Sequence, residues 1–302
     1  MSRGTPCARF TRPLTREPST SPCHVRSKVR PVTEFPVPPP LSGTGPARII
    51  ALCNQKGGVG KTTTCVNLAA ALAEYGRKVL LVDFDPQGAA SANLRVNSND
   101  FETTVYDLLL SSKVQTKDVI VSTAVEGLFV LPANIDLSAA EVQLVGEVAR
   151  ESALARALRP IVDDYDVILI DCQPSLGLLT VNALVAAHGV VIPLACEFFA
   201  MRGVALLVDT VGKVQDRLNP RLALDAIVPT MYDARTLHAQ EVVSRVREAF
   251  GDRVTETMIG RTIKFPDATV AAEPILTFAP THVGSEQYRQ LARELVARGV
   301  SA

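Results

Sequence analysis

Residues 56 to 63 read Lys-Gly-Gly-Val-Gly-Lys-Thr-Thr, which places two lysines, three glycines and two hydroxyl groups close together. Glycines let a tight loop turn its backbone N–H groups inward, because no Cβ stands in the way. Lys61 can reach the distal phosphates of a nucleotide, and the Thr62 hydroxyl can ligate Mg²⁺. Thr63 can donate to a more distal phosphate oxygen. The segment therefore predicts a phosphate-binding loop.

The flanking residues place this loop between a strand and a helix. Residues 47 to 54 are short and apolar, and residues 61 to 75 carry apolar side chains at helical spacing before Gly76. A helix that begins near Lys61 adds the partial positive charge of its N-terminus. A glycine-rich turn with a solvated lysine is the plain alternative, but strand, glycines, Lys-Thr and helix together favour nucleotide. The predicted nucleotide-binding residues are Lys56, Gly57, Gly58, Val59, Gly60, Lys61, Thr62 and Thr63.

Three carboxylates follow two further apolar segments. Asp83 and Asp85 end the segment that starts at Val79, and Asp171 ends the segment that starts at Asp166. Carboxylates at the carboxyl ends of parallel strands face the ligand crevice. Asp171 fits the acid that holds Mg²⁺ in P-loop NTPases. Any one of them alone could equally be a helix cap or a turn residue.

These motifs resemble the deviant-Walker ATPases of the ParA/Soj type, which partition chromosomes and plasmids. The resemblance covers about residues 48 to 299, and it is most specific at 54–64, 83–88 and 170–177. The usual P-loop begins with glycine, whereas this chain has Gln55 followed by an extra lysine, Lys56. The resemblance implies ATP and Mg²⁺ as cofactors, and it makes Lys56, Lys61 and Asp85 the catalytic residues.

Further roles also come from the resemblance. Lys56 would cross an ATP-sandwich homodimer, Asp85 would orient the attacking water, and Asp83 would support the magnesium shell beside Thr62 and Asp171. Arg235 and Lys264 match positions where the family carries basic residues that contact DNA, so they are the predicted DNA-binding residues. The implied partners are nonspecific DNA and a ParB-like or condensin-associated protein. No membrane is implied.

The chain also departs from the family pattern. Gln173-Pro174 stands where most relatives have Pro-Pro, and Gly260-Arg261-Thr262 stands where they have Pro-Arg-Asn near the adenine. Together with the segment 264–267, these changes resemble an actinobacterial subset of ParA-like proteins that is associated with chromosome organisation. The resemblance therefore does not identify the residues that contact the adenine base.

The N-terminal stretch differs in composition from the rest. Residues 1 to 47 hold ten of the 20 prolines and seven Lys and Arg against two acids. Such a stretch buries too little apolar surface to order itself, so we expect a disordered tail over 1–46 and an ATPase domain over 47–302. Since the whole chain is neutral, a tail of +5 leaves −5 on the domain. DNA binding would then require a local basic patch.

The order of elements predicts an α/β fold with a doubly wound, mostly parallel sheet and helices on both faces. Expected strands are 48–54, 79–84, 128–132, 166–171, 189–195 and 224–230, and expected helices are 61–75, 138–159, 178–187, 201–218 and 236–250. The six cysteines show no metal-ligand spacing, and they indicate the buried thiols of a cytoplasmic protein. We expect it to associate with the nucleoid.

Two other functions fit the same loop. A MinD-like membrane-cycling ATPase would need an amphipathic anchor helix at its C-terminus, but Tyr288, Leu291, Leu295 and Val296 form a narrow stripe suited to docking on the domain. A metabolic or redox enzyme on this scaffold, such as an iron-sulfur reductase or an ATP-dependent synthetase, is a third possibility. The reductase would need cysteines on the dimer face to hold a shared cluster, and Cys172 lies near the nucleotide, but relatives in the partition group carry cysteine there too. The sequence thus favours an ATP-switched ATPase that binds DNA.

Overall fold

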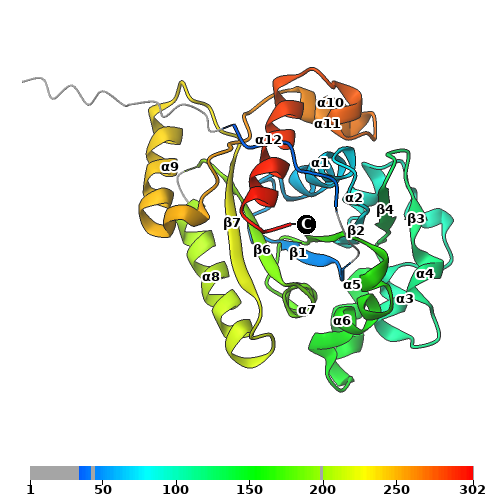
Figure 1. The fold of residues 1–302 in the computed structure, drawn as a ribbon. Coiled ribbons are helices and arrows are strands. Elements are labelled where there is room, and N and C mark those ends of the chain that lie inside the picture. Colours follow the sequence, from blue (N-terminus) through cyan, green and yellow to red (C-terminus); the bar gives the residue numbers. More distant parts are fainter. Residues whose placement is uncertain (1–33, 42–44, 198–199, 302) are drawn as a thin grey trace, which may run out of the picture. The chain divides into compact units, whose positions relative to one another are not determined.

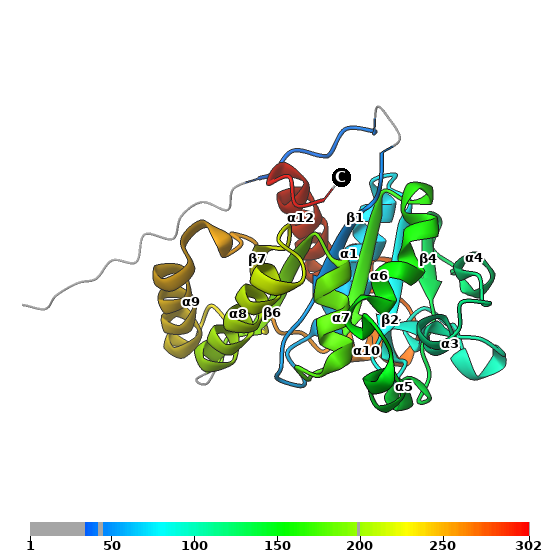
Figure 2. The ribbon, with the colours of Figure 1, turned by 90° about the horizontal axis from the view of Figure 1, so that it is seen from below.

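The computed structural model describes residues 34–41, 45–197 and 200–301. Within these residues the chain builds one seven-stranded sheet in the order β3-β4-β2-β5-β1-β6-β7 (Figures 1 and 2). Every pairing is parallel except that of β3 with β4. The strands are β1 (Arg48–Leu52), β2 (Val79–Phe84), β3 (Val121–Ser122), β4 (Leu128–Leu131), β5 (Val167–Cys172), β6 (Gly189–Ala195) and β7 (Ala223–Thr230). The predicted doubly wound fold is confirmed, and β3 is a strand that the sequence did not predict.

Helices cover both faces of the sheet because alternate residues of each strand point to opposite sides. Ile50 and Leu52 of β1 join one apolar core, and Ile49 and Ala51 join the other. The first face carries α1 (Lys61–Glu74), α2 (Ala89–Ala92), α10 (Lys264–Val270), α11 (Ile275–Phe278) and α12 (Val283–Ala297). The second carries α3 (Val105–Leu110), α4 (Thr116–Val119), α5 (Leu137–Gln143), α6 (Ala153–Leu158), α7 (Leu178–Ala186), α8 (Ala200–Arg217) and α9 (Leu237–Phe250).

The prediction of a single helix over 138–159 was wrong. The structure breaks it into α5, the short 3₁₀ turns Leu144–Gly146 and Arg150–Ser152, and α6. Ala149 adopts a left-handed conformation with φ +54°, which an α-helix of L-residues cannot continue through. The carbonyls freed by the break accept side-chain donors instead: Asn182 donates to the Arg150 carbonyl and Arg156 to the Ala149 carbonyl.

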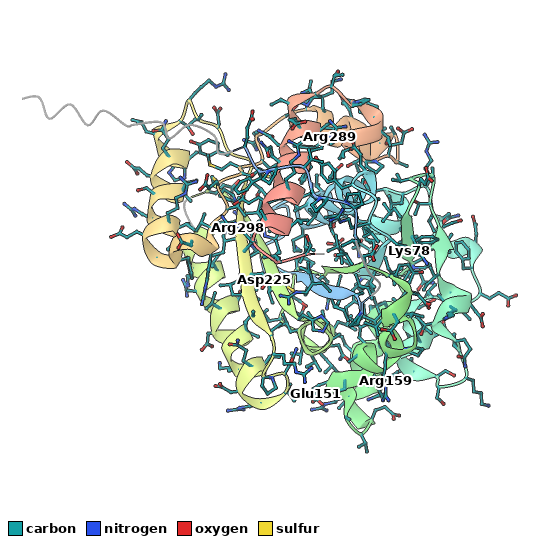
Figure 3. The ribbon with its side chains drawn as sticks, viewed as in Figure 1. Lys78, Glu151, Arg159, Asp225, Arg289 and Arg298 are labelled. Atoms are coloured by element: carbon teal, nitrogen blue, oxygen red, sulfur yellow. The ribbon has the colours of Figure 1, made fainter. Side chains whose placement is uncertain are left out.

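The helix α12 is fixed to the domain by polar contacts and by an apolar stripe. Arg289 donates to both oxygens of Glu74 on α1 at 3.0 Å, while the buried Glu294 accepts from the backbone N–H groups of Glu256 and Thr257 at 2.8 Å. Figure 3 labels Arg289 and Arg298, and Arg298 pairs with Glu294. Tyr288, Leu291 and Leu295 are fully buried and Val296 packs against the same core. The predicted docking of this stripe on the domain is confirmed.

The expected tail lies mostly outside the described residues. Residues 34–41 form no helix or strand, and Arg77 donates to the Pro39 carbonyl at 2.8 Å. The boundary between tail and domain stays a prediction.

An ion pair links the amino-terminal parts of β1 and β7. Arg48 donates to Asp225 at 3.1 Å, and Asp225, labelled in Figure 3, packs against the backbone of Gly189 on β6. A Cβ added at Gly189 would lie 1.6 Å from Asp225 Oδ2. Only glycine therefore allows this carboxylate to reach Arg48.

We expect Gly189→Ala to destabilise the domain by about 1–3 kcal/mol, since the added methyl group must displace Asp225 from a packed position. Gly212→Ala is the matched control: a Cβ there meets no atom within 4 Å, and alanine in a helix gains up to about 1 kcal/mol over glycine. Urea unfolding of both variants measures the difference. Equal midpoints for the two would contradict the packing role of Gly189.

Candidate nucleotide-binding site

The glycine-rich loop lies between β1 and α1, at the carboxyl end of β1. Gly58 and Gly60 have φ values of +72° and +85°, a region that glycine occupies without strain. A Cβ at Gly57, Gly58 or Gly60 would meet no atom within 4 Å, so the space that these residues border is open. This is the room that a phosphate group needs.

Three buried contacts hold the loop in place. The Asn54 side chain donates to the Pro193 carbonyl on β6 at 2.7 Å, and it accepts from the Lys56 backbone N–H at 3.0 Å. The Thr230 hydroxyl at the end of β7 donates to the Val59 carbonyl at 2.8 Å. The loop is therefore fixed to two strands, β6 and β7, before any ligand binds. Asn54 and Thr230 were not predicted as site residues, although Asn54 is the first residue of the family motif at 54–64.

Lys61 is the first residue of α1 and is only 7% exposed. Its ammonium group donates to the Lys56 carbonyl at 3.2 Å. Burial lowers the pKa of Lys61, while the carboxylates of Asp171 and Asp85 oppose this shift. Lys61 is thus a poorly solvated cation between an open loop and two acids, and an anionic ligand would replace the hydration that it lacks.

Asp83 and Asp171 are fully buried and stand opposite each other in the register of β2 and β5. The Ser91 hydroxyl and backbone N–H donate to Asp83 at 2.7 and 2.8 Å. Neither oxygen of Asp171 accepts a hydrogen bond of normal geometry from a described residue. Burial raises the pKa of Asp171 to about 8 and that of Asp83 to about 6; repulsion from Asp83 adds to the first shift, and the Thr62 side chain opposes it.

A divalent cation fits this arrangement. A buried carboxylate without a partner is costly, and Mg²⁺ prefers one or two carboxylates together with hydroxyl, phosphate and water oxygens. Asp171 and Thr62 supply such donors beside the loop. Asp83 is engaged by Ser91, which suits the supporting position expected for it better than direct ligation. Asp85 is only partly buried, and it accepts from the Gln87 N–H at 3.0 Å.

Lys56 makes a contact that the sequence did not predict. Its ammonium group pairs with Glu197, which follows β6, and both side chains are about half exposed, at 47% and 50%. In a single subunit this lysine is held by a carboxylate of its own chain. Glu197 lies in the segment 193–200 that resembles the family, but its role as a partner of Lys56 required the fold.

The two residues expected to contact DNA lie on adjoining segments. The Tyr232 N–H donates to the Ile259 carbonyl at 3.0 Å and the Arg261 N–H to the Tyr232 carbonyl at 3.2 Å, which ties the Arg235 turn to the segment before Lys264. Arg235 is 89% exposed and makes a bidentate pair with Asp233, and Lys264 pairs with Asp267 at 3.1 Å. Each candidate cation therefore has a carboxylate beside it.

The cysteines that the structure describes are all buried, as expected. Cys53 and Cys172 end neighbouring strands with their sulfur atoms 3.1 Å apart, directly next to the phosphate loop and Asp171. Burial raises the pKa of the Cys172 thiol well above its usual range. The Cys172 thiol is thus a protonated packing group at the base of the site.

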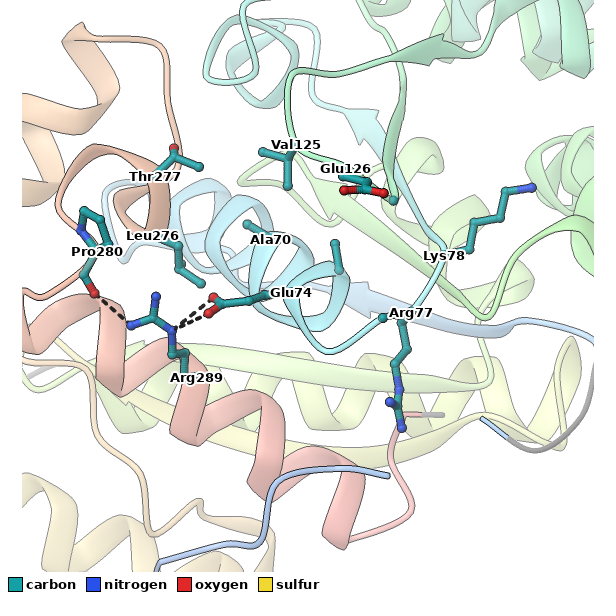
Figure 4. A pocket seen from close by; sticks show the side chains of 13 residues that line it. Ala70, Glu74, Arg77, Lys78, Val125, Glu126, Leu276, Thr277, Pro280 and Arg289 are labelled. Carbon is teal, nitrogen blue, oxygen red and sulfur yellow. Dashed lines mark hydrogen bonds and ion pairs between the residues drawn. The ribbon is translucent and has the colours of Figure 1, made fainter. Parts of the chain in front are cut away.

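A groove of about 700 Å³ lies at the opposite end of the sheet (Figure 4). The C-terminal end of α1, the turn before β2, the loop before β4 and the helices α11 and α12 enclose it, and the Arg289–Glu74 pair lies along its wall. None of the predicted site residues lines it.

Comparisons with known proteins agree with this site. Residues 47–224 match a family described as an AAA domain. The chain is 47% identical to the sporulation initiation inhibitor protein Soj of Bacillus subtilis over 83% of this chain and 99% of that protein. The chain belongs to the ParA/Soj family of P-loop ATPases.

Two mycobacterial proteins are also similar over most of this chain. An uncharacterized protein of Mycobacterium tuberculosis is 57% identical over 89% of this chain and 85% of its own length. A Mycobacterium smegmatis structure named cobyrinic acid a,c-diamide synthase, with bound ADP and magnesium, is 41% identical, has a TM-score of 0.74 and covers 84% of this chain and 95% of that one. The ParA/Soj fold predicted from the motifs is thereby confirmed.

The unpartnered Asp171 generates a prediction about stability. The pKa of Asp171 in the folded protein, about 8, lies above its unfolded value near 3.8, so between these two pH values the folded protein binds a proton that the unfolded chain does not. The contribution of Asp171 to the free energy of unfolding therefore falls as pH rises from about 4 toward 8. We expect Asp171→Asn to raise the Tm of the metal-free protein at pH 8 by about 2–4 °C, the shift that roughly 1 kcal/mol produces in a domain of this size. The variant should gain nothing further from Mg²⁺ and nucleotide.

Thermal melts with and without Mg²⁺ and nucleotide test this, with Asp209→Asn as the control. Asp209 is 55% exposed, so the same change of charge there should leave the Tm nearly unchanged. A lower Tm for metal-free Asp171→Asn would mean that the Asp171 side chain has a partner.

Proposed function

We propose that this protein is a partition ATPase that binds and slowly hydrolyses ATP with Mg²⁺, and that ATP joins two subunits into a dimer that binds DNA nonspecifically. Lys56 carries the proposal. This half-exposed lysine is the first residue of the phosphate loop. Its ammonium group pairs with Glu197, which lies outside the loop. A lysine in that place can reach a nucleotide bound by a second subunit.

ATP and Mg²⁺ are supported by the site itself and by a relative. The open glycine loop, the poorly solvated Lys61 and the unpartnered Asp171 together need an anion and a cation. The 41% identical structure from M. smegmatis holds ADP and magnesium. Asp85 orients the attacking water, since it is the third acid of the group and its carboxylate is near enough to Lys61 to affect the lysine pKa.

DNA is the proposed target of the ATP-bound dimer. Arg235, Arg261 and Lys264 gather on two joined segments, and the same two segments carry Asp233 and Asp267. One subunit thus presents a weakly basic surface, and two subunits side by side present twice as many cations to a duplex. Phosphate contacts of this kind do not depend on base sequence.

Relatives in the family support a cellular role in partitioning. One is named the sporulation initiation inhibitor protein Soj in B. subtilis, and another is named the chromosome-partitioning ATPase Soj in Treponema pallidum. We infer a role in chromosome segregation or organisation on the nucleoid, with a ParB-like or condensin-associated protein as partner. The identity of 57% to a mycobacterial protein agrees with the expected actinobacterial subset.

A membrane-cycling function has less support. The apolar stripe of α12 is buried in the domain and so is not available to lipid. Among the described residues, no helix is long and apolar enough to span a bilayer.

A redox or metabolic function has less support. A cluster shared between two subunits needs exposed thiolates, whereas Cys172 is 1% exposed and protonated. The synthase name belongs to the M. smegmatis relative, and none of the described cysteines is exposed as a nucleophile would be.

Lys56→Ala and Lys61→Ala should separate dimer formation from nucleotide binding. Lys56→Ala removes the cation that crosses to the partner, so ATP should bind while the ATP-dependent dimer is lost. Lys61→Ala removes a charged hydrogen bond to phosphate, which costs about 1.5–3 kcal/mol, or roughly 10- to 150-fold in affinity. Sedimentation and nucleotide titration measure the two effects. The same monomer–dimer balance for wild type and Lys56→Ala in ATP would refute the cross-subunit role.

The carboxylates beside the candidate DNA contacts give a second test. Arg235→Ala removes one phosphate contact per subunit, so the plot of log K against log salt should flatten by roughly two units for a dimer. Asp233→Asn frees Arg235 and should strengthen binding in the same assay. Unrelated duplexes with and without ATP serve as probes, and Glu248→Gln on α9 is the control for loss of an acid elsewhere. Binding that ignores both ATP and Arg235 would place the DNA contact in another part of the chain.

A further inference from the structure

Glu141 on α5 is hydrogen-bonded to the segment that follows Asp171. Its Oε1 atom accepts from the Gln173 side chain at 3.1 Å and from the Leu179 backbone N–H at 3.3 Å. None of the ion pairs between described residues includes Glu141. The two donors are 32 and 38 residues away along the chain, so this carboxylate joins elements that are distant in sequence.

The second donor belongs to the first turn of α7, whose N-terminus has no side-chain cap of its own. Gly177 stands at the N-cap position, and glycine has no side chain that could accept from the free N–H groups of the first turn. A carboxylate at a helix N-terminus is also stabilised by the partial positive charge there. Glu141 therefore supplies, from another helix, the cap that the local sequence lacks.

Gly177 leaves the room that this cap needs. An added Cβ at Gly177 would lie 2.2 Å from Glu141 Oε1, while the Gly177 φ of −79° is one that alanine adopts without strain. Because the carboxylate is the free end of a flexible side chain, an alanine at this position would displace Glu141 and leave the backbone in place. The glycine is thus matched to the carboxylate that packs against it.

The capped segment begins at the edge of the sheet where the ligands of parallel sheets bind. The strand β5 ends at Cys172, so the sheet fixes Asp171 but does not fix residues 173–177. The other hydrogen bonds that this segment makes with described residues stay within 173–181, such as that from the Thr180 hydroxyl to the Ser175 carbonyl at 2.8 Å. Glu141 is therefore its hydrogen-bonded link to another part of the domain.

We propose that Glu141 is a positioning residue for the magnesium end of the nucleotide site, because it caps α7 and holds Gln173 and thereby fixes the segment that follows Asp171. The burial of Leu137 and Leu144 in the core gives this carboxylate a rigid base. The effect on Mg²⁺ rests on the proposed ATPase function, whereas the cap does not.

Cys172 reports on this segment in the protein without ligand. Cys172 and Cys65 on α1 are 1% and 0% exposed, so a maleimide labels either thiol only when the structure around it opens. In Glu141→Ala we expect Cys172 to label about fivefold faster than in wild type, the factor that loss of a cap gives in a local opening equilibrium, with Cys65 unchanged. Mass spectrometry of the labelled peptides measures both rates.

Glu147→Ala is the matched control, since it removes the same charge from an exposed position on the same segment and should label like wild type. Unchanged labelling of Cys172 in Glu141→Ala would overturn the proposal. Equal acceleration of Cys172 and Cys65 would overturn it too, because it would show that the whole domain is destabilised.

Gly177→Ala breaks the same contact without removing the carboxylate. It should speed the labelling of Cys172 as Glu141→Ala does, and the double variant should label no faster than either single one. Glu141→Gln, whose amide oxygen still accepts a hydrogen bond, should fall between wild type and Glu141→Ala. Additive effects in the double variant, or a glutamine no better than alanine, would refute the cap.

The link to the metal is measured by titrating Mg²⁺ into the protein with a fluorescent ATP analogue. The Mg²⁺ concentration for half-maximal binding should rise roughly threefold or more in Glu141→Ala, less than the roughly 10- to 100-fold effect of a residue that touches a metal ligand directly. Glu147→Ala should match wild type. A cap with a purely structural role would lower the Tm and leave this concentration unchanged.

The same Mg²⁺ dependence in wild type, Glu141→Ala and Glu147→Ala would therefore refute the positioning role. A wild type that binds the analogue without any dependence on Mg²⁺, together with the labelling difference at Cys172, would count against the proposed ATPase function and the metal role, and would leave the cap standing.

Discussion

Two buried carboxylates, Asp83 and Asp171, lie opposite each other at the carboxyl ends of neighbouring strands. Burying two acids side by side is unfavourable, and the rest of the site is arranged to compensate for it. Strand register puts them opposite each other, and burial raises the pKa of both acids; repulsion from Asp83 adds to the shift of Asp171, and repulsion from Asp85 adds to that of Asp83. Ser91 satisfies Asp83 with two hydrogen bonds, which leaves Asp171 without a partner. Lys61 is close enough to lower the pKa of Asp171, but burial weakens the lysine as a cation. A magnesium ion held by Asp171, with nucleotide phosphates beside Lys61, would satisfy both of these groups together.

The loop has its binding conformation before the ligand arrives, because the sheet holds it rigidly. Asn54 and Thr230 attach its backbone to the ends of β6 and β7, and the first turn of α1 follows at once. A preorganised loop loses little conformational freedom when phosphate binds. Lys56 is the exception, since an exposed ion pair such as that with Glu197 is worth less than about 1 kcal/mol. The site thus combines a rigid phosphate loop with one lysine, Lys56, that can change its position at a small cost in free energy.

The sequence predicted the parts of the site that are local and missed those that join distant segments. The glycines, Lys61, Thr62 and the strand-end acids occur in runs of a few residues, and the six predicted strands exist with ends within two residues of those expected. Glu197 beside Lys56, Ser91 beside Asp83 and Asp233 beside Arg235 depend on how loops fold back. The helix expected over 138–159 failed because apolar periodicity persists across the left-handed residue at Ala149, and side chains of Arg156 and Asn182 satisfy the broken turn.

That break has a consequence for how the second face of the sheet is used. A continuous helix over 138–159 would bury one stripe along its whole length, whereas the structure has two separate helices, α5 and α6. The short α5 segment buries Leu137, Ala140 and Leu144 and turns Val142 and Val145 outward, while Glu141 between the two sides reaches the segment after Asp171. Because Glu141 accepts from the Gln173 side chain and from the Leu179 backbone N–H, the break allows α5 to support the segment that follows the predicted metal ligand Asp171.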